Sequence, residues 1–349
     1  MAHTICTFNA NNLFARYRFS DIYPGDKSGK SRAPAEFAYL PMDQKGMVEL
    51  FNEEQREITA LALKRGNPHA ARKQMPDVIC LQEIESMAAL RVFNDTYLGG
   101  MYSHAILIDG RDLRNIDVAL LTNLEILQVR SHLDDLDTQA SKPRYLFSRD
   151  CLEVVLALNT SGSETLTLFV NHLKSKYAES AQERRTGDAL RCRQADGVRR
   201  IAHDRFPGEE FDRKYFAVIG DMNDEPASPH LEPLVKQAQL VDAFERIATE
   251  CDRWTHWYSS ENSVSQLDHI LLSPRLARDT GNQPPEIERR GIGFSRVLQT
   301  GQPGPKTTRF FRHDNDAKPI DVPFQFKRFA GVSPKQWASD HCPVFLELP

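Results

Sequence analysis

The chain has 349 residues, of which 40% are hydrophobic and 26% are charged. This composition is that of an ordinary folded protein with enough apolar residues for a large core, and it excludes a disordered or fibrous chain. The formal net charge of −4 argues against a protein that coats nucleic acid by charge alone, although a local basic groove is compatible with it.

The six cysteines are widely scattered and form no Cys-x-x-Cys pair, so neither a zinc knuckle nor a redox motif is indicated. We expect these thiols to be reduced. The first residues lead directly into a strand without a charged and apolar leader, and no apolar run is long enough to cross a membrane. We therefore expect a cytoplasmic protein with no membrane contact and no obligate protein partner.

The amino-terminal part of the chain predicts one strand, one long loop and one helix. Residues 4–8 are predicted to form a strand, which runs into Asn9 and Asn11 at a spacing of two. For these two asparagines alone, a polar turn is the better interpretation. Residues 15–45 have no clear period and predict a surface loop, whereas residues 47–65 show helical spacing of apolar residues before Gly66.

A second strand is predicted over residues 76–84, with a continuous apolar centre and Glu83 near its end. A glutamate at the end of a buried strand is costly unless it is paired or bound to a metal. The alternative is a surface glutamate at the start of a helix over residues 85–93, where negative charge is favourable. Residues 117–122 predict another buried strand, and residues 125–129 are expected to continue the sheet.

Two further strands, residues 151–159 and 165–170, are predicted to form a hairpin. The second strand ends in Asn171 and His172, with Lys174 two residues later. The histidine could be a structural residue at a strand end. Its polar and basic neighbours favour a group that faces a phosphate.

An arginine-rich segment over residues 179–206 predicts a helix with one buried stripe that includes Leu190, Val198 and Ile201. A charged helix face is usually only solvated. The same arginines, together with Lys174 and Lys176, could alternatively supply contacts to phosphate.

The segment around Asp221 is the most informative in the chain. Residues 216–219 form a short apolar run, Gly220 allows a sharp turn, and Asp221 and Asn223 follow at a spacing of two. On an extended segment this spacing puts both side chains on the same side. A metal ion or a phosphoryl oxygen could lie there, although an Asx-rich turn explains the local pattern equally well.

The carboxy-terminal part contains an aromatic strand over residues 254–258 and a later apolar strand that includes Asp268. Residues 281–336 are rich in proline, glycine and basic residues, and we expect a long irregular excursion without a core of its own. The last predicted strand begins at Asp340 and His341.

Six clusters of polar residues therefore lie at or near strand ends. Their order resembles that of the endonuclease/exonuclease/phosphatase superfamily, and the aromatic strand before Asp268 is most similar to its bacterial nuclease-type branch. The segments that carry the resemblance are Phe8-Asn-Ala-Asn11, Leu81-Gln-Glu83, Asn171-His172, Gly220-Asp-Met-Asn223, Leu267-Asp-His269 and Ser339-Asp-His341. The resemblance implies the α/β (α+β) DNase I-like fold, a four-layer sandwich of two mixed β-sheets packed face to face with flanking helices. A single domain would span residues 1–349, with long insertions near 15–75 and 281–336.

The resemblance also implies a metal site. Glu83 matches the principal metal-binding carboxylate of the family, and Asn9 and Asp340 match secondary contributors. Asn11 stands where many relatives have an acidic residue, so a second metal site would be weak or absent. Oxygen ligands with one or two carboxylates fit Mg²⁺ or Mn²⁺.

The catalytic groups follow by the same comparison. His341 matches the catalytic histidine, and Asp268 matches the carboxylate that orients it. Asp221 and Asn223 match the pair that positions the attacking water and the phosphate, and His172 matches a second histidine that stabilises phosphoryl oxygens or assists the leaving group. The sequence leaves open whether Asp221 or His341 takes the proton of the water.

These assignments predict divalent-metal-dependent hydrolysis of phosphodiester bonds, with DNA or RNA as substrate and Lys174 and Asn171 as substrate-binding residues. One alternative is a phosphatase or phosphodiesterase of a small phosphorylated molecule or a lipid headgroup. Another is a non-catalytic binding module on the same fold, since a fold does not fix a function.

Overall fold

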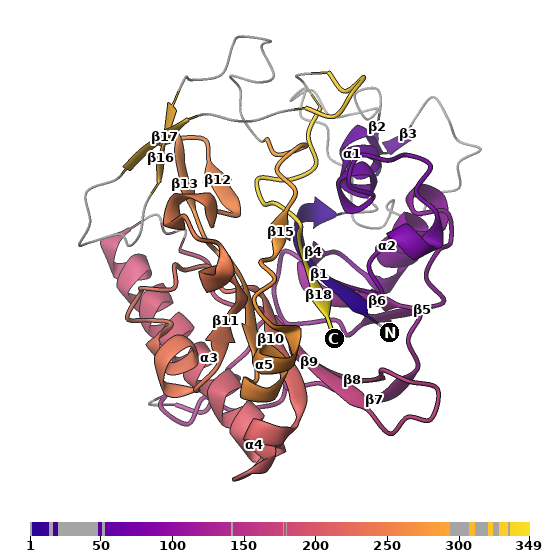
Figure 1. Ribbon diagram of the computed structural model, residues 1–349. Coiled ribbons are helices and arrows are strands. Elements are labelled where there is room, and N and C mark those ends of the chain that lie inside the picture. The colour runs from indigo at the N-terminus through magenta and orange to yellow at the C-terminus, as the bar shows by residue number, and fades with distance from the viewer. Residues whose placement is uncertain are drawn as a thin grey trace.

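The computed structural model describes residues 2–13, 17–19, 48–50, 53–140, 142–176, 178, 180–293, 307–310, 320–323, 328–333 and 336–349. Two six-stranded sheets form its centre (Figure 1). In the first sheet, β1 pairs in parallel with β4 and antiparallel with β18, and His3 lies opposite Leu348, so the two ends of the chain are neighbours. In order across this sheet, the strands are β15 (Glu286–Ile287), β18 (Val344–Leu348), β1 (His3–Leu13), β4 (Val78–Ile84), β6 (Asp117–Thr122) and β5 (His104–Leu107).

The second sheet has β9 and β10 as parallel neighbours at its centre, and β14 is antiparallel to β10. The predicted hairpin is present, because β8 and β9 pair along their whole length. In order across the sheet, the strands are β11 (Val241–Asp242), β14 (Asp268–Leu272), β10 (Tyr215–Asp221), β9 (Thr165–His172), β8 (Cys151–Ala157) and β7 (Ile126–Arg130). The segment after β6 therefore joins the second sheet rather than extending the first.

The two sheets pack face to face through alternate residues of their strands. Val78 and Cys80 of β4 contact the core between the sheets, together with Leu168 and Val170 of β9. The intervening residues Ile79 and Leu81 point to the other face of the first sheet, where they pack against helices. Because strand side chains alternate between faces, apolar residues at every position require cover on both sides.

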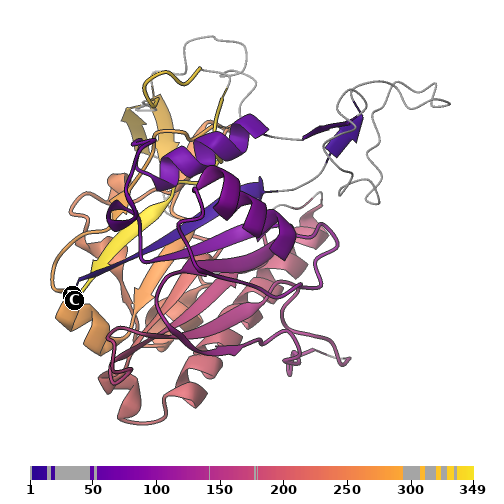
Figure 2. The same ribbon diagram turned by 90° about the vertical axis from the view of Figure 1, so that its right-hand side faces the viewer.

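Helices supply that cover (Figures 1 and 2). Helices α1 (Glu53–Leu63) and α2 (Met87–Val92) pack on the outer face of the first sheet, and α3 (Ala181–Arg205) packs on the outer face of the second. The result is the expected four-layer DNase I-like sandwich. The other helices among the described residues are α4 (Glu210–Arg213), α5 (Pro274–Thr280) and the single turns η3 (Arg72–Gln74), η4 (Phe93–Tyr97), η5 (Pro233–Gln237), η6 (Ala243–Arg246) and η7 (Glu250–Asp252).

The first predicted helix is shorter than expected. It begins at Glu53 rather than near residue 47, because β3 (Val48–Leu50) is a strand that pairs with β2 (Tyr17–Phe19). Ile58 and Leu63 of α1 are buried in the outer core of the first sheet. This part of the predicted insertion near 15–75 therefore belongs to the core, whereas residues 20–47 lie outside the described residues.

The irregular excursion expected over residues 281–336 is in part regular, and its described strands share a core with residues 254–264 instead of forming one of their own. Strands β16 (Thr307–Phe310) and β17 (Ile320–Pro323) join β12 (His256–Tyr258) and β13 (Ser263–Ser265) in a small third sheet. Its buried cluster includes Trp254, Trp257, Phe310 and Val322. Strands of four residues are too short to show a period in a sequence. Residues 294–306, 311–319, 324–327 and 334–335 of this predicted insertion lie outside the described residues.

Most arginines of α3 form ion pairs within the protein. Arg191 is buried against Asp224 and Asp188, whereas the predicted stripe residues Leu190 and Ile201 are only half-buried. The buried stripe of α3 contains Arg191, Ala195, Val198 and Ala202. The other pairs are Arg193 with Asp137, Arg199 and Arg200 with Asp196, and Arg205 with Glu153. The structure thus gives these arginines internal partners, which weakens the alternative in which they bind phosphate.

Candidate active site

The polar clusters converge at one end of the sandwich. The parallel strands β1 and β4 end there in one sheet, and β9 and β10 end there in the other. Strands β14 and β18 run in the opposite direction, so Asp268 begins β14 at this end and Asp340 and His341 lie just before β18. Asn9 Nδ2 donates to Asp221 Oδ2 at 2.9 Å and so links the two sheets across the site.

The backbone of the site is irregular in both sheets. Asn11, Glu83 and Asn223 have φ values of 46°, 63° and 55°. The ladders around β4 shift register at this point, next to Glu83. Asparagine tolerates this left-handed region, whereas a glutamate there costs free energy that the surrounding structure must offset. The irregularity turns Glu83 out of the regular alternation of its strand.

Gly220 allows the second sheet to close around the site. Its φ is +134°, and a Cβ atom at this position would lie 2.0 Å from the carbonyl oxygen of Asn171. Only glycine fits this close approach of β10 to β9. The next residues along the two strands, Asp221 and His172, lie opposite each other.

Asp221 is the centre of the hydrogen-bond network. Its Oδ1 accepts from the Asn223 amide nitrogen at 2.8 Å, and its Oδ2 accepts from Asn223 Nδ2 at 3.1 Å. His172 Nε2 lies 3.4 Å and His341 Nε2 3.8 Å from Asp221 Oδ2. Burial raises the pKa of Asp221, and the charge of His341 opposes that shift. The carboxylate is therefore held between two imidazoles by two asparagine side chains.

His341 and Asp268 form a buried pair. His341 Nδ1 lies 2.8 Å from Asp268 Oδ2. Burial alone would lower the pKa of His341, but the carboxylates of Asp268 and Asp221 outweigh it and raise the pKa to about 10. His341 is therefore a charged imidazolium at neutral pH in this structure.

His172 has the opposite character. Burial, followed by the positive charges of Arg149 and His341, lowers its pKa well below the usual value. Arg149 is buried beside it and donates to the carbonyl oxygen of Leu173, the next residue along the chain. The site thus contains one neutral and one charged histidine on either side of Asp221.

Glu83 provides the carboxylate of the expected metal site. Its Oε2 accepts from the Asn12 amide nitrogen at 3.1 Å, and its Oε1 lies 3.8 Å from His172 Nε2. Burial and the negative charges of Asp340 and Asp221 raise the pKa of Glu83. A cation bound here would relieve the repulsion between these carboxylates, so their donor set fits a hard divalent ion.

Asn9 and Asn11 orient carboxylates in this arrangement. Asn11 Nδ2 donates to Asp340 Oδ1 at 2.8 Å, in the same way that Asn9 donates to Asp221. Their side-chain oxygens accept hydrogen bonds from the Asn11 amide nitrogen and from Asn12 Nδ2. Coordination of a metal by Asn9 or Asn11 stays a prediction.

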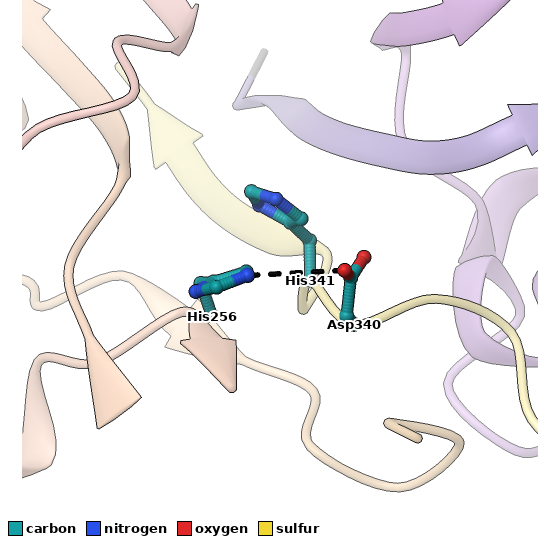
Figure 3. Close-up of side chains that lie close together, drawn as sticks. All are labelled: His256, Asp340 and His341. Carbon is teal, nitrogen blue, oxygen red and sulfur yellow. Dashed lines mark ion pairs between the residues drawn. The ribbon is translucent and has the colours of Figure 1, made fainter. Parts of the chain in front are cut away.

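His256 is a site residue that the sequence analysis missed (Figure 3). Its Nε2 lies 3.8 Å from Asp340 Oδ2, and its ring centroid lies 4.6 Å from that of His341. In the sequence it was visible only as a polar residue in an aromatic strand, and its approach to Asp340 depends on how that strand docks. Trp257 donates its amide to the Asp340 carbonyl oxygen, which fixes this contact.

Other residues fix the backbone of the site segments by hydrogen bonds. The Thr255 hydroxyl accepts from the amide nitrogens of Leu267 and Asp268, and the Ser339 hydroxyl donates to the Asn9 carbonyl oxygen. Gln55 Nε2 donates to the carbonyl oxygens of Asn11 and Ala338. Nothing in their sequence surroundings marks Thr255 or Gln55, because their role comes from contacts between distant segments.

The two predicted substrate-binding residues differ in position. Asn171 is fully buried, and its side chain lies on the helix-covered face of β9, opposite to His172. Strand alternation turns the Asn171 side chain away from the site, which does not support a contact with substrate, and that role stays a prediction. Lys174 is half-buried beside the first turns of α3, where its side chain lies near Gly187. Its role in substrate binding stays a prediction.

Two groups of side chains in the described part of the chain have ligand atoms within 4.8 Å of one another and could hold a metal ion. They are His256, Asp340 and His341, and Asp221, Asp268 and His341. Glu83 belongs to neither group. Asp340 links Glu83 to the first of these groups, because its negative charge also raises the pKa of Glu83.

A family model described as the Endonuclease/Exonuclease/phosphatase family matches residues 6–341. The chain belongs to this family. The match spans every cluster of the site. Comparison with curated proteins found no match.

Solved structures of similar fold cover the whole chain. The human Nocturnin catalytic domain with bound sulfate is 12% identical, over 100% of this chain and 94% of that chain, with a TM-score of 0.53. Sphingomyelinase C from Streptomyces griseocarneus is 15% identical over 100% of both chains, with a TM-score of 0.53. Truncated Caenorhabditis elegans TDP2 is 14% identical, over 100% of this chain and 98% of that chain, with a TM-score of 0.52. At identities this low, the similarity shows a shared fold and nothing about function.

The endonuclease/exonuclease/phosphatase family consists of hydrolases that generally depend on a divalent metal, and this member has acidic and histidine side chains that could hold one. Within the part of the chain that the structure describes, no helix has the length and apolar character needed to cross a membrane.

Proposed function

We propose that this protein is a Mg²⁺- or Mn²⁺-dependent phosphodiester hydrolase that cleaves DNA or RNA. The observation that carries the proposal is the position of Asp221 between the neutral His172 and the charged His341. Hydrolysis of a phosphodiester requires a base for the attacking water and positive groups for the phosphoryl oxygens. This arrangement supplies both.

Asp221 is the better base of the two groups that the sequence left open. With a pKa of about 10, His341 carries its proton at neutral pH and cannot accept another. Asp221 accepts hydrogen bonds from Asn9 and Asn223 that fix the direction of its carboxylate. In the proposed reaction Asp221 takes a proton from water, and Asn223 keeps the carboxylate in place.

The histidines act on the phosphate. The charged His341 donates a hydrogen bond from Nε2 to a phosphoryl oxygen, and Asp268 holds its ring through Nδ1. The neutral His172 makes the second contact with the phosphoryl group or the leaving oxygen in the proposed reaction. A divalent cation held by Glu83 and Asp340, with Asn9 and Asn11 as further candidate ligands, would neutralise the charge that develops on the phosphoryl oxygens.

Both sheets contribute to the same site, since Asn9 and Glu83 come from the first and Asp221 and His172 from the second. This supports a single catalytic domain over residues 1–349. The choice of a polynucleotide rests on the cationic groups beside His172, namely Arg149 and Lys174. Phosphate groups that flank the scissile bond would meet positive charge on that side.

The alternative substrate class is a small phosphorylated molecule or a lipid headgroup. The net charge of −4 favours it mildly, and one protein of the same fold is named a sphingomyelinase. The two classes differ in size and charge, so salt dependence separates them: binding of a polynucleotide weakens steeply with salt.

The test is a hydrolysis panel of supercoiled plasmid, single-stranded DNA, RNA and bis-p-nitrophenyl phosphate, each with Mg²⁺ and with a chelator. Cleavage of a polynucleotide that requires the metal and disappears in Asp221→Ala and His341→Ala supports the proposal. Hydrolysis of the small diester alone moves the assignment to the alternative class. Full activity of both variants would show that the site is elsewhere.

A further inference from the structure

The turn between β5 and β6 projects an apolar and a basic side chain at the end of the sandwich that carries the site. The Asn115 amide nitrogen donates to the Asp112 carbonyl oxygen at 3.0 Å, which closes the turn around Leu113 and Arg114. Leu113 is 99% exposed and is the most exposed of the large hydrophobic residues in the described chain. The Arg114 side chain is 60% exposed. Strand β6 then begins at Asp117, next to the end of β4 that carries Glu83.

The turn is held in a fixed position relative to His172. Asp112 Oδ2 accepts from Arg149 Nε at 3.0 Å, and Arg149 Nη1 donates to the Leu173 carbonyl oxygen at 3.0 Å. The side chain of Arg149 is only 2% exposed. Asp112 Oδ1 also accepts from the Arg114 amide nitrogen at 3.0 Å and from its Nε at 3.2 Å. A buried arginine therefore joins the base of the turn to the strand end of the candidate active site.

Positive charge gathers between this turn and the site. After burial, the charges of Arg149 and Arg114 lower the pKa of Lys174, and both arginines also lower the pKa of His172. Asp112 is the acidic group that opposes them. Among the described residues, Lys174 forms no ion pair. Arg149 is buried, so a strand of phosphates leaving the site on this side would meet Lys174 and Arg114, which are both partly exposed.

A fully exposed leucine at the tip of an anchored turn adds nothing to the core. Burying such a side chain is favourable when a partner covers it. One leucine is too little for stable attachment to a lipid surface, which takes more than a single acyl chain. Apolar side chains flanked by arginine are, however, used by proteins to enter the base stack of a nucleic acid.

We propose that the turn Asp112–Asn115 is a polynucleotide contact, in which Arg114 binds a phosphate beside the scissile one and Leu113 packs against the adjacent base. This inference rests on the proposed nuclease function and goes further, because it names the element that contacts the polymer beyond the scissile bond. A small diester has no second phosphate or base to place there. The turn would therefore separate polymeric from small substrates.

The test compares two substrates in the full-length protein. The ratio of kcat/KM for a DNA oligonucleotide to kcat/KM for bis-p-nitrophenyl phosphate is measured in wild type, Leu113→Ser and Arg114→Gln. We expect the ratio to fall about 5–20-fold in each variant. Arg114→Gln should also reduce the slope of log affinity against log salt by about one, whereas Leu113→Ser should leave it unchanged. Leu127→Ser, on the exposed side of β7, is the matched apolar control.

The outcomes separate the two proposals. If wild type cleaves no polynucleotide, both the nuclease assignment and the role of the turn fail. If wild type cleaves it and both variants keep the wild-type ratio, only the role of the turn fails. If instead Leu113→Ser loses binding to anionic phospholipid vesicles while its ratio holds, the turn serves a lipid surface and the polynucleotide contact is refuted.

Discussion

Replacing Asp268 by asparagine should show whether the charge on His341 is needed for the reaction. The variant keeps the shape of the side chain but removes the carboxylate that lies 2.8 Å from His341 Nδ1. Without it, the pKa of His341 should fall from about 10 toward its ordinary value, although Asp221 remains nearby. The imidazole would then lose its proton near neutral pH, and the phosphoryl oxygen would lose a charged donor.

The size of the effect follows from the burial of the pair. Asp268 is fully buried, and His341 is 7% exposed. Removing one partner of a buried ion pair costs about 3–5 kcal/mol. If this loss falls on the transition state, kcat drops about 10²–10⁴-fold, at about 1.4 kcal/mol per factor of ten. Since the pKa of His341 is raised from 6.5 to about 10, its contribution to folding stability is present below about pH 6.5 and is lost as the pH rises through about 10.

The assay is the pH profile of kcat for bis-p-nitrophenyl phosphate, together with the NMR titration of the His341 ring. Asp242→Asn is the matched control, because Asp242 is a buried carboxylate beside His269 outside the site. We expect loss of activity and a lowered titration midpoint in Asp268→Asn only. A wild-type kcat and an unchanged His341 titration in Asp268→Asn would refute this account of the pair.

Three further predictions concern stability. Burial and neighbouring carboxylates raise the pKa of Glu83, so its ionised form destabilises the metal-free fold. In a thermal-shift assay, Glu83→Gln should therefore raise the melting temperature without metal and remove the stabilisation by Mg²⁺. A Cβ at position 220 would lie 2.0 Å from a backbone oxygen, so Gly220→Ala should lower the free energy of unfolding in urea by more than about 3 kcal/mol. Gly208→Ala is the control, because a Cβ there has nothing within 4 Å, and it should lower that free energy by about 1 kcal/mol. Arg191→Met removes the buried Nε donor to Asp224 but leaves Lys176 paired with that carboxylate, so it should cost about 1.5–3 kcal/mol. Arg200→Ala, at the half-exposed end of its pair, should cost under about 1 kcal/mol. Equal losses would contradict the ion-pair interpretation of α3.

The strands that carry the site could be predicted from the sequence because they are continuously apolar and end in polar residues. The runs before Glu83, His172 and Asp221 are covered on both faces, and that pattern is unusual enough to identify buried strands. The resemblance then placed them in one fold, and the family match agrees with it.

The residues that sequence analysis missed are those whose role depends on distant contacts. His256 approaches Asp340 only because β12 docks beside the segment before β18. Arg149 lies in a polar turn, and its link to Asp112 and Leu173 has no local signal. Asn171 shows the converse case, because a residue next to a histidine in the sequence lies on the other face of the strand.

The most direct test of the central claim is to measure metal binding and hydrolysis together at Glu83. Mn²⁺ binding would be followed by electron paramagnetic resonance, and hydrolysis of bis-p-nitrophenyl phosphate would be measured on the same samples of wild type and Glu83→Gln. We predict that wild type binds Mn²⁺ and that Glu83→Gln loses binding and hydrolysis in parallel while it keeps its fold by circular dichroism. Wild-type hydrolysis that persists in a chelator, or a Glu83→Gln variant that binds and hydrolyses normally, would contradict a metal-dependent site at this position.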